Sequence, residues 1–137
     1  IWIILAAVLL IYPKTRKTGI IVAAALIVDL ILCNVILKNL IARTRPYDIN
    51  TAVQIIIAKP HDYSFPSGHT AASFASVAAL YLAGAKKGWK IAGVLAVLIA
   101  FSRLYFYVHF PTDVLGGIVF GILSGVIGYE IVKKKIG

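Results

Sequence analysis

Residues 102–113 read SRLYFYVHFPTD and place a cation, an imidazole and a carboxylate in an otherwise apolar sequence: Arg103, His109 and Asp113. Such groups are costly in apolar surroundings unless they have a partner or a function. Pro111 is expected to end one apolar helix, so that Asp113 opens the next one. A carboxylate beside an imidazole is the arrangement that a nucleophilic or general-base histidine requires. The spacing H-x-x-x-D carries little weight alone, so its meaning depends on the rest of the chain.

The composition is that of an integral membrane protein. The chain has 137 residues, of which 61% are hydrophobic and 14% charged, and its mean hydropathy is +0.93. A soluble domain of this size would need far more polar surface. The net charge of +9 does not indicate a nucleic-acid partner, because the basic residues form short clusters between apolar runs. A single cysteine, Cys33, excludes an internal disulfide and a multi-cysteine metal site.

The apolar runs predict a single all-α domain, residues 1–137, built as a bundle of five transmembrane helices. The second helix is expected to continue to about Thr44, where Pro46 stops it, and residues 47–65 form a connection. The expected helices are Ile1–Tyr12, Gly19–Leu37, Ser67–Ala83, a fourth that follows Lys90 and ends near Val108, and Thr112–Val132. Spanning a bilayer takes about 20 apolar residues, so we expect the first helix to begin upstream of residue 1.

Three basic clusters mark alternate ends of the predicted helices. By the positive-inside rule these clusters define the cytoplasmic face of a multi-pass protein of the cell membrane. They are Lys14/Arg16/Lys17, Lys86/Lys87/Lys90 and Lys133/Lys134/Lys135. The opposite end receives all three histidines, and we therefore expect a functional site that faces the extracellular or periplasmic side.

The first polar cluster on that side is Lys38 with Arg45 and Pro46. On a continuing helix seven residues make almost two turns, so the two cations share a face and suit an anion such as phosphate. The alternative is that they only meet the membrane interface. Arg43 is assigned either to a headgroup or to lipid phosphates. Asp29 lies nine residues before Lys38, on the opposite face of a regular helix, and we expect it to hydrogen-bond a neighbouring helix.

The second cluster is Pro66-Ser67-Gly68-His69 at the start of the third helix. Ser67 is a good N-cap, and Gly68 allows a ligand to approach the backbone closely. Free N–H groups at a helix start attract anions. The alternative is a helix that is simply capped.

Glycines at four-residue spacing in the fifth helix predict close helix packing. We expect them to pack against small residues of the third helix, which would bring His69 near His109; dimerisation through the glycines is the alternative. The glycines are Gly117, Gly121 and Gly125, and the small residues are Ala71, Ala72, Ser73, Ala75 and Ser76.

Together the clusters supply three fixed cations, a backbone anion site, two histidines and a carboxylate. Metal-ligand spacing is absent from the sequence, so no metal and no other cofactor are expected. A metal-free phosphoryl-transfer site fits this set of residues best.

The three clusters resemble the signature of the type 2 phosphatidic acid phosphatase superfamily, which shares its site with vanadium haloperoxidases and glucose-6-phosphatase. The signature is K-x6-R-P, then P-S-G-H, then S-R-x5-H-x3-D. All eleven fixed positions agree in order and spacing: Lys38, Arg45, Pro46, Pro66, Ser67, Gly68, His69, Ser102, Arg103, His109 and Asp113. The membrane branch of this family usually has six helices, of which this chain would hold five.

The resemblance implies a role for each matched residue. His109 would attack phosphorus and form a phosphohistidine, with Asp113 on its other ring nitrogen, and His69 would protonate the leaving oxygen. The phosphate oxygens would be bound by the cations and by backbone N–H groups, whereas Ser102 would support Arg103 and Pro66 would support the second cluster. The expected phosphate ligands are Lys38, Arg45, Arg103, Ser67 and Gly68.

The predicted function is hydrolysis of a phosphomonoester or diphosphate of a lipid in the bilayer. Polyprenyl diphosphates such as undecaprenyl diphosphate, phosphatidic acid and phosphatidylglycerophosphate are all plausible substrates. One alternative is a non-catalytic protein that binds or transports lipid phosphates. Another is a vanadate-dependent haloperoxidase, which the small membrane-spanning chain disfavours.

Overall fold

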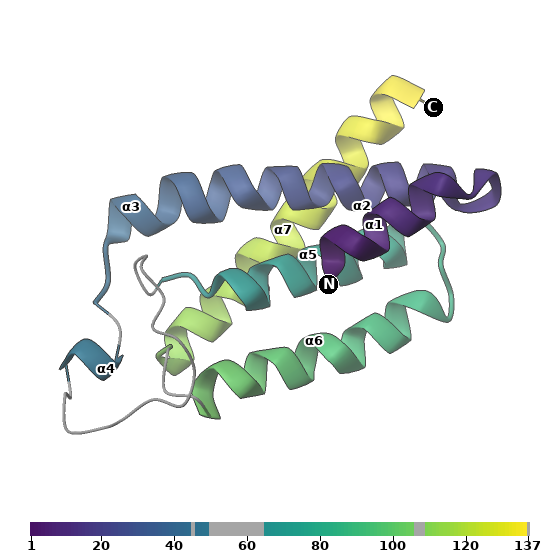
Figure 1. Cartoon of the computed structure of the whole chain (residues 1–137). Helices are drawn as coiled ribbons and strands as arrows, with labels where there is room; N and C mark the ends of the chain where they lie inside the picture. Colours follow the sequence, from purple (N-terminus) through teal and green to yellow (C-terminus); the bar gives the residue numbers. More distant parts are fainter. Residues whose placement is uncertain (45, 50–64, 106–108, 137) are drawn as a thin grey trace.

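The structure is a computed structural model that describes residues 1–44, 46–49, 65–105 and 109–136, and these residues contain helices and turns but no strand (Figure 1). The prediction of an all-α bundle is confirmed. Its helices are α1 Trp2–Ile11, α2 Arg16–Asp29, α3 Lys38–Ile41, α4 Pro46–Ile49, α5 Gly68–Leu82, α6 Gly88–Tyr105 and α7 Pro111–Ile136, with a 3-10 turn η1 at Pro13–Thr15 and a π-helix η2 at Leu30–Leu37.

Three helical segments in the described part of the chain are long and apolar enough to cross a membrane. They are Pro13–Ile41, which joins η1, α2, η2 and α3 into one rod, Gly88–Tyr105 and Pro111–Lys135. Large apolar side chains on α6 point outward, among them Val94 and Phe101, which are 63% and 65% exposed. This surface is suited to lipid, as expected for a multi-pass membrane protein.

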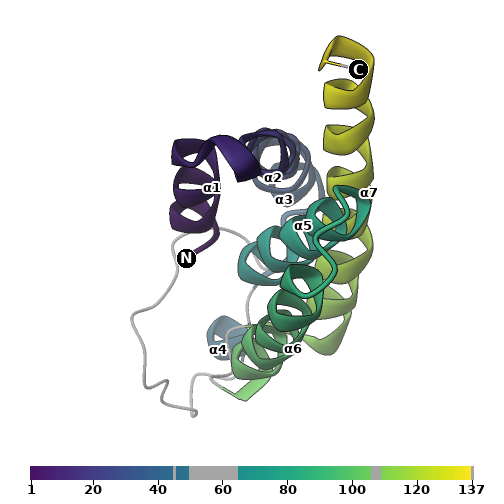
Figure 2. The same cartoon turned by 90° about the vertical axis from the view of Figure 1, so that its right-hand side faces the viewer.

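Helix α5 lies near the middle of the bundle, with α2, α6 and α7 around it (Figure 2). Glycines of α7 make the packing close: a Cβ added to Gly121 would lie 2.4 Å from the carbonyl oxygen of Ala71, and one added to Gly125 would lie 2.7 Å from that of Ala75. The predicted contact between the third and fifth helices is therefore present. The glycines serve packing within one chain.

The π-helix η2 changes the face on which Asp29 lies. In an α-helix nine residues make two and a half turns, whereas the i→i+5 bonds of a π-helix widen each turn to more than four residues. Asp29 and Lys38 consequently lie close enough to interact electrostatically, and both are buried. The prediction of opposite faces was therefore wrong. Asp29 also lies beside Cys33 of the same rod, and its Oδ1 has no hydrogen-bond partner among the described residues.

The rod ends earlier than predicted. Helix α3 stops at Ile41 because Ala42 adopts a left-handed conformation with φ 50°, and the chain turns there instead of continuing to Thr44. A single turn of helix, α4, then begins at Pro46, as the fixed φ of proline allows at a helix start. Arg45 lies outside the described residues, so the predicted shared face of Lys38 and Arg45 does too.

The bundle has two different ends (Figure 1). The α1–α2 turn, the α5–α6 turn and the C-terminal end of α7 lie toward one end, and these segments carry the three basic clusters. Helix α3, the start of α5, the end of α6 and the start of α7 lie toward the other end, and these segments carry or adjoin described residues of all three signature clusters. The separation of basic turns from signature residues therefore holds in three dimensions.

Candidate active site

A cavity of about 430 Å³ lies where the three sequence clusters meet. Residues of all three clusters line it: Lys38 of α3, Gly68 and His69 of α5, Ser102 and Arg103 of α6, and His109 just before α7. Its remaining walls are formed by Ile1, Trp2, Asn34, Ala72, Ser73 and Ile99. Six of the predicted site residues thus surround one space.

Lys38 and Gly68 join the first cluster to the second. Lys38 is only 2% exposed although it carries a charge. A Cβ added to Gly68 would lie 3.4 Å from Asn34 Oδ1 and 3.9 Å from Lys38 Nζ. The missing side chain of Gly68 therefore leaves room beside the ammonium group. A ligand can approach the start of α5 there.

Ser67 caps α5, as its sequence position predicts. Its hydroxyl oxygen accepts a hydrogen bond from the N–H of Thr70 at 3.4 Å, and its hydroxyl contacts Thr70 Oγ1 at 3.0 Å. The backbone N–H of Ser67 donates to the carbonyl oxygen of Asp113 at 3.0 Å. That N–H is therefore occupied within the fold, which corrects its expected role as a phosphate ligand. Pro66 is likewise fully buried.

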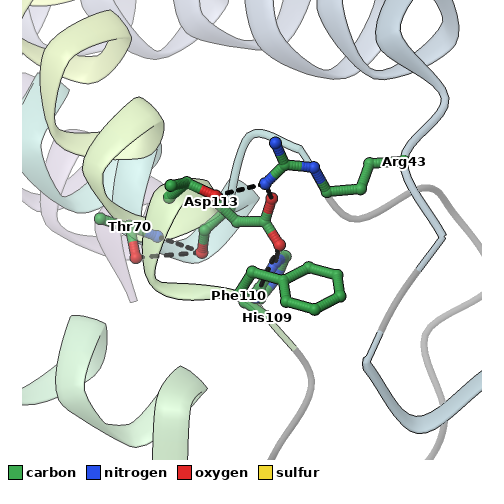
Figure 3. A network of polar contacts seen from close by, with 7 residues as sticks. Arg43, Thr70, His109, Phe110 and Asp113 are labelled. Atoms are coloured by element: carbon green, nitrogen blue, oxygen red, sulfur yellow. Dashed lines mark hydrogen bonds and ion pairs between the residues drawn. The ribbon is translucent and has the colours of Figure 1, made fainter. Parts of the chain in front are cut away.

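His109 and Asp113 form a buried pair at the start of α7 (Figure 3). His109 Nδ1 lies 3.5 Å from Asp113 Oδ2. The four-residue spacing of the third cluster brings the two side chains together. The same oxygen accepts a hydrogen bond of 2.7 Å from the N–H of Phe110. Because Asp113 occupies the Nδ1 side of the ring, the other ring nitrogen of His109 is the one that can meet a ligand.

Arg43 is a second side-chain partner of Asp113, and it is charged (Figure 3). Its Nη1 lies 2.8 Å from Asp113 Oδ1 and also donates to the hydroxyl of Thr112. The guanidinium carbon lies 5.3 Å from the centre of the Phe65 ring and 5.7 Å from that of Phe110. From its sequence position, Arg43 was expected to bind a headgroup or to meet lipid phosphates. No spacing signal pointed to Asp113, which lies 70 residues away.

Ser102 and Arg103 lie at the end of α6. The Ser102 hydroxyl donates to the carbonyl oxygen of Ile99 at 2.6 Å and accepts a long hydrogen bond of 3.5 Å from Arg103 Nε. The supporting role of Ser102 stays a prediction. Among the described residues, His, Cys, Asp and Glu side chains form no group of three that could hold a metal ion.

The arrangement suits an anion with several oxygens. Two cations face the cavity from different helices, and fixed positive groups in a partly enclosed site stabilise charge that spreads over equatorial oxygens. His69 is exposed to the cavity, whereas His109 is buried and backed by a carboxylate. The two imidazoles therefore have different surroundings, as an acid and a nucleophile require.

The family profile described as the PAP2 superfamily matches residues 18–136. Among curated proteins, the chain is similar to an undecaprenyl-diphosphatase of Sulfolobus acidocaldarius, with 36% identity over 121 residues that make up 88% of this chain and 58% of that protein. It is also similar to phosphatidylglycerophosphatase B of Bacillus subtilis, with 42% identity over 102 residues, 67% of this chain and 47% of that protein. The chain thus spans about half the length of these relatives.

Two solved structures share the fold. The crystal structure of a transmembrane PAP2-type phosphatidylglycerolphosphate phosphatase from Bacillus subtilis has a TM-score of 0.71 and 33% identity, and the match covers 97% of this chain and 67% of that one. The crystal structure of Aquifex aeolicus LpxE has a TM-score of 0.77 and 30% identity, and the match covers 92% of this chain and 74% of that one.

Proposed function

Because the chain belongs to the PAP2 superfamily, we propose that it is a membrane lipid phosphatase that removes phosphate from a lipid phosphate or diphosphate. One observation supports this proposal above the others. Lys38, His69, Arg103 and His109, which come from three distant stretches of sequence, line one cavity.

In the proposed first step, the ring nitrogen of His109 that faces the cavity attacks phosphorus. The P–N bond forms as the P–O bond to the lipid breaks, and His69 gives its proton to the leaving oxygen. Asp113 holds the Nδ1 side of the ring and offsets the positive charge that the imidazole gains. In the second step, His69 takes a proton from a water that attacks phosphorus. The P–N bond then breaks and inorganic phosphate leaves.

The cations of the site would bind the non-bridging oxygens throughout. Charge spreads over these oxygens in the transition state of phosphoryl transfer, so fixed cations lower the barrier. Lys38 and Arg103 reach the cavity from different helices, and Arg45 is assigned to the same task by its place in the signature. The proposed reaction uses no metal ion, since the protein cations supply the charge.

The lipid and the side of the membrane are inferred from different observations. The curated relatives named above are an undecaprenyl-diphosphatase and a phosphatidylglycerophosphatase, so a lipid phosphate or diphosphate is the shared chemistry. The positive-inside rule places the basic turns in the cytoplasm, and the cavity would then face the extracellular or periplasmic side of the cell membrane. A protein that only binds lipid phosphates would need the cations but not the paired His109 and Asp113.

The direct test is phosphate release by the purified full-length protein in detergent. Undecaprenyl diphosphate, phosphatidic acid and phosphatidylglycerophosphate are supplied separately, each with EDTA present. We expect release from at least one lipid and loss of release in His109→Ala. With 32P-labelled lipid and an alkaline SDS quench, which preserves a P–N bond, we expect a 32P label on the wild-type protein that is absent from that variant. Release that persists in His109→Ala would contradict the assigned nucleophile. Tight lipid binding without any turnover would favour the non-catalytic alternative.

A further inference from the structure

The carboxylate of Asp113 divides its two oxygens between different partners. Oδ2 faces His109 Nδ1 at 3.5 Å and accepts the N–H of Phe110. Oδ1 binds Arg43 Nη1 at 2.8 Å. The Asp113 side chain has no exposed surface, so water does not solvate its charge. Arg43 therefore offsets the cost of burying the carboxylate beside the imidazole, because a buried charge needs a compensating partner.

The backbone brings Arg43 to Asp113 by a specific turn. The left-handed conformation of Ala42 ends α3 one residue before Arg43, so the arginine leaves the axis of the rod and extends to the start of α7. There its guanidinium is held by Asp113, by the Thr112 hydroxyl and by the faces of two aromatic rings, Phe65 and Phe110. A side chain fixed by this many contacts is poorly placed to follow a mobile lipid headgroup.

Arg43 contacts Asp113 but does not line the cavity. The described residues that line it include neither Arg43 nor Asp113. His109 lines the cavity, Asp113 contacts His109, and Arg43 contacts Asp113 (Figure 3). The guanidinium offers a rigid planar group of donors. It can therefore fix the orientation of a carboxylate as well as balance its negative charge.

We propose that Arg43 is a positioning residue of the reaction, which holds the Asp113 carboxylate so that His109 keeps one ring orientation toward phosphorus. This inference rests on the proposed phosphatase function. It differs from the expectation that Arg43 binds a headgroup, because a headgroup ligand acts on substrate affinity, whereas a positioning residue acts on the chemical step. Loss of orientation at a reacting group lowers turnover even when substrate still binds.

The test compares Arg43→Met, Arg43→Lys, Asp113→Asn and the double variant Arg43→Met/Asp113→Asn, with kcat and KM measured on a lipid monophosphate and on a lipid diphosphate. We expect Arg43→Met to lower kcat by roughly 10- to 100-fold on both substrates, with KM changed by less than about threefold. Arg43→Lys should recover part of kcat, since it keeps the charge but loses the planar fork. The double variant should be no worse than the poorer single variant, because both changes break the same chain of contacts.

Arg16→Met is the matched control. Arg16 also donates to oxygens, the carbonyls of Leu10 and Ile11, but it lies at the α1–α2 turn, at the other end of the bundle. Its loss should shift thermal unfolding without a selective fall in kcat, and all variants are assayed well below their unfolding temperatures.

Three outcomes overturn the proposal. The first is an increase in KM with unchanged kcat in Arg43→Met, above all one that differs between monophosphate and diphosphate, since this would make Arg43 a headgroup ligand. The second is wild-type kinetics in Arg43→Met, or a loss of kcat in the double variant that equals the product of the losses in Arg43→Met and Asp113→Asn. The third is a wild-type protein that turns over none of the lipids, which removes the proposed function and the inference together. The first two outcomes leave the proposed function standing.

Discussion

The carbonyl oxygen of Asp113 accepts a hydrogen bond of 3.0 Å from the backbone N–H of Ser67. Ser67 caps the helix whose first turn carries His69, and Asp113 lies in the first turn of α7, four residues after His109. One backbone hydrogen bond thus links the starts of the two helices that position the two histidines. The distance between His69 and His109 therefore depends on how closely α5 and α7 pack.

A methyl group between these two helices should separate them. In Gly121→Ala the new Cβ would lie 2.4 Å from the backbone oxygen of Ala71, which cannot rotate away. We expect a loss of stability of about 1–3 kcal/mol and reduced phosphate release. Thermal unfolding and turnover in detergent measure the two effects.

Gly93→Ala is the control for that experiment. Gly93 lies in α6 with no heavy atom within 4 Å of an added Cβ among the described residues. Alanine should therefore be neutral, or stabilising by up to about 1 kcal/mol through helix propensity. Equal behaviour of the two variants would contradict the importance of α5–α7 packing.

Gly68 should be sensitive for a different reason. In Gly68→Ala the added Cβ would make ordinary contacts, 3.4 Å from Asn34 Oδ1 and 3.9 Å from Lys38 Nζ, so the protein should fold normally. The methyl group would nevertheless occupy space beside the ammonium group where phosphate is proposed to bind. We expect the inhibition constant of inorganic phosphate to rise about tenfold, equivalent to about 1.4 kcal/mol.

Gly88→Ala is a close match for that variant. Gly88 also begins an α-helix, α6, and an added Cβ would likewise lie 3.4 Å from its nearest neighbour. It lies on the α5–α6 turn, away from the cavity, and should leave phosphate inhibition unchanged. If both alanine variants bind phosphate as the wild type does, the proposed phosphate position beside Gly68 is wrong.

The parts of the site that sequence predicted are those set by short-range geometry. The Ser67 cap, the close glycine packing of Gly121 and the pairing of His109 with Asp113 each follow from spacing along one or two helices. Such features depend on turn geometry that proline, glycine and serine impose locally.

The features that the sequence did not predict arise from departures from regular α-helix and from contacts between residues far apart in the chain. The π-helix between Asp29 and Lys38 contains no proline or glycine from which a departure from regular α-helix could be predicted. The left-handed Ala42 is a backbone state that alanine rarely adopts, and it is what sends Arg43 toward Asp113. The N–H of Ser67 looked available because its acceptor lies 46 residues later, on another helix.

Ser73 connects α5, which carries His69, to α1. Its hydroxyl accepts a hydrogen bond from Trp2 Nε1 at 2.8 Å and donates to the carbonyl oxygen of His69 at 2.6 Å. Ser73→Ala would leave the indole N–H buried without this acceptor, at a cost of about 1–3 kcal/mol. We expect the same change to cost less in a Trp2→Phe background, where no N–H needs a partner. Thermal unfolding of the four proteins checks this, and strictly additive losses would contradict the coupling.

Lys38 combines deep burial with a place in the cavity wall, so its removal should affect phosphate binding strongly. A hydrogen bond to a charged group contributes about 1.5–3 kcal/mol, which corresponds to a fall in kcat/KM of about 10- to 100-fold in Lys38→Met. Methionine fills similar volume, so the fold should persist. Lys86→Met is the control, because it changes the net charge equally at an exposed position on the α5–α6 turn, away from the site. It should leave kcat/KM within about twofold of the wild-type value, since surface charges contribute little. Comparable losses in both variants would mean that the overall charge of the protein attracts the lipid phosphate, and the ammonium group of Lys38 would then have no specific part in binding it.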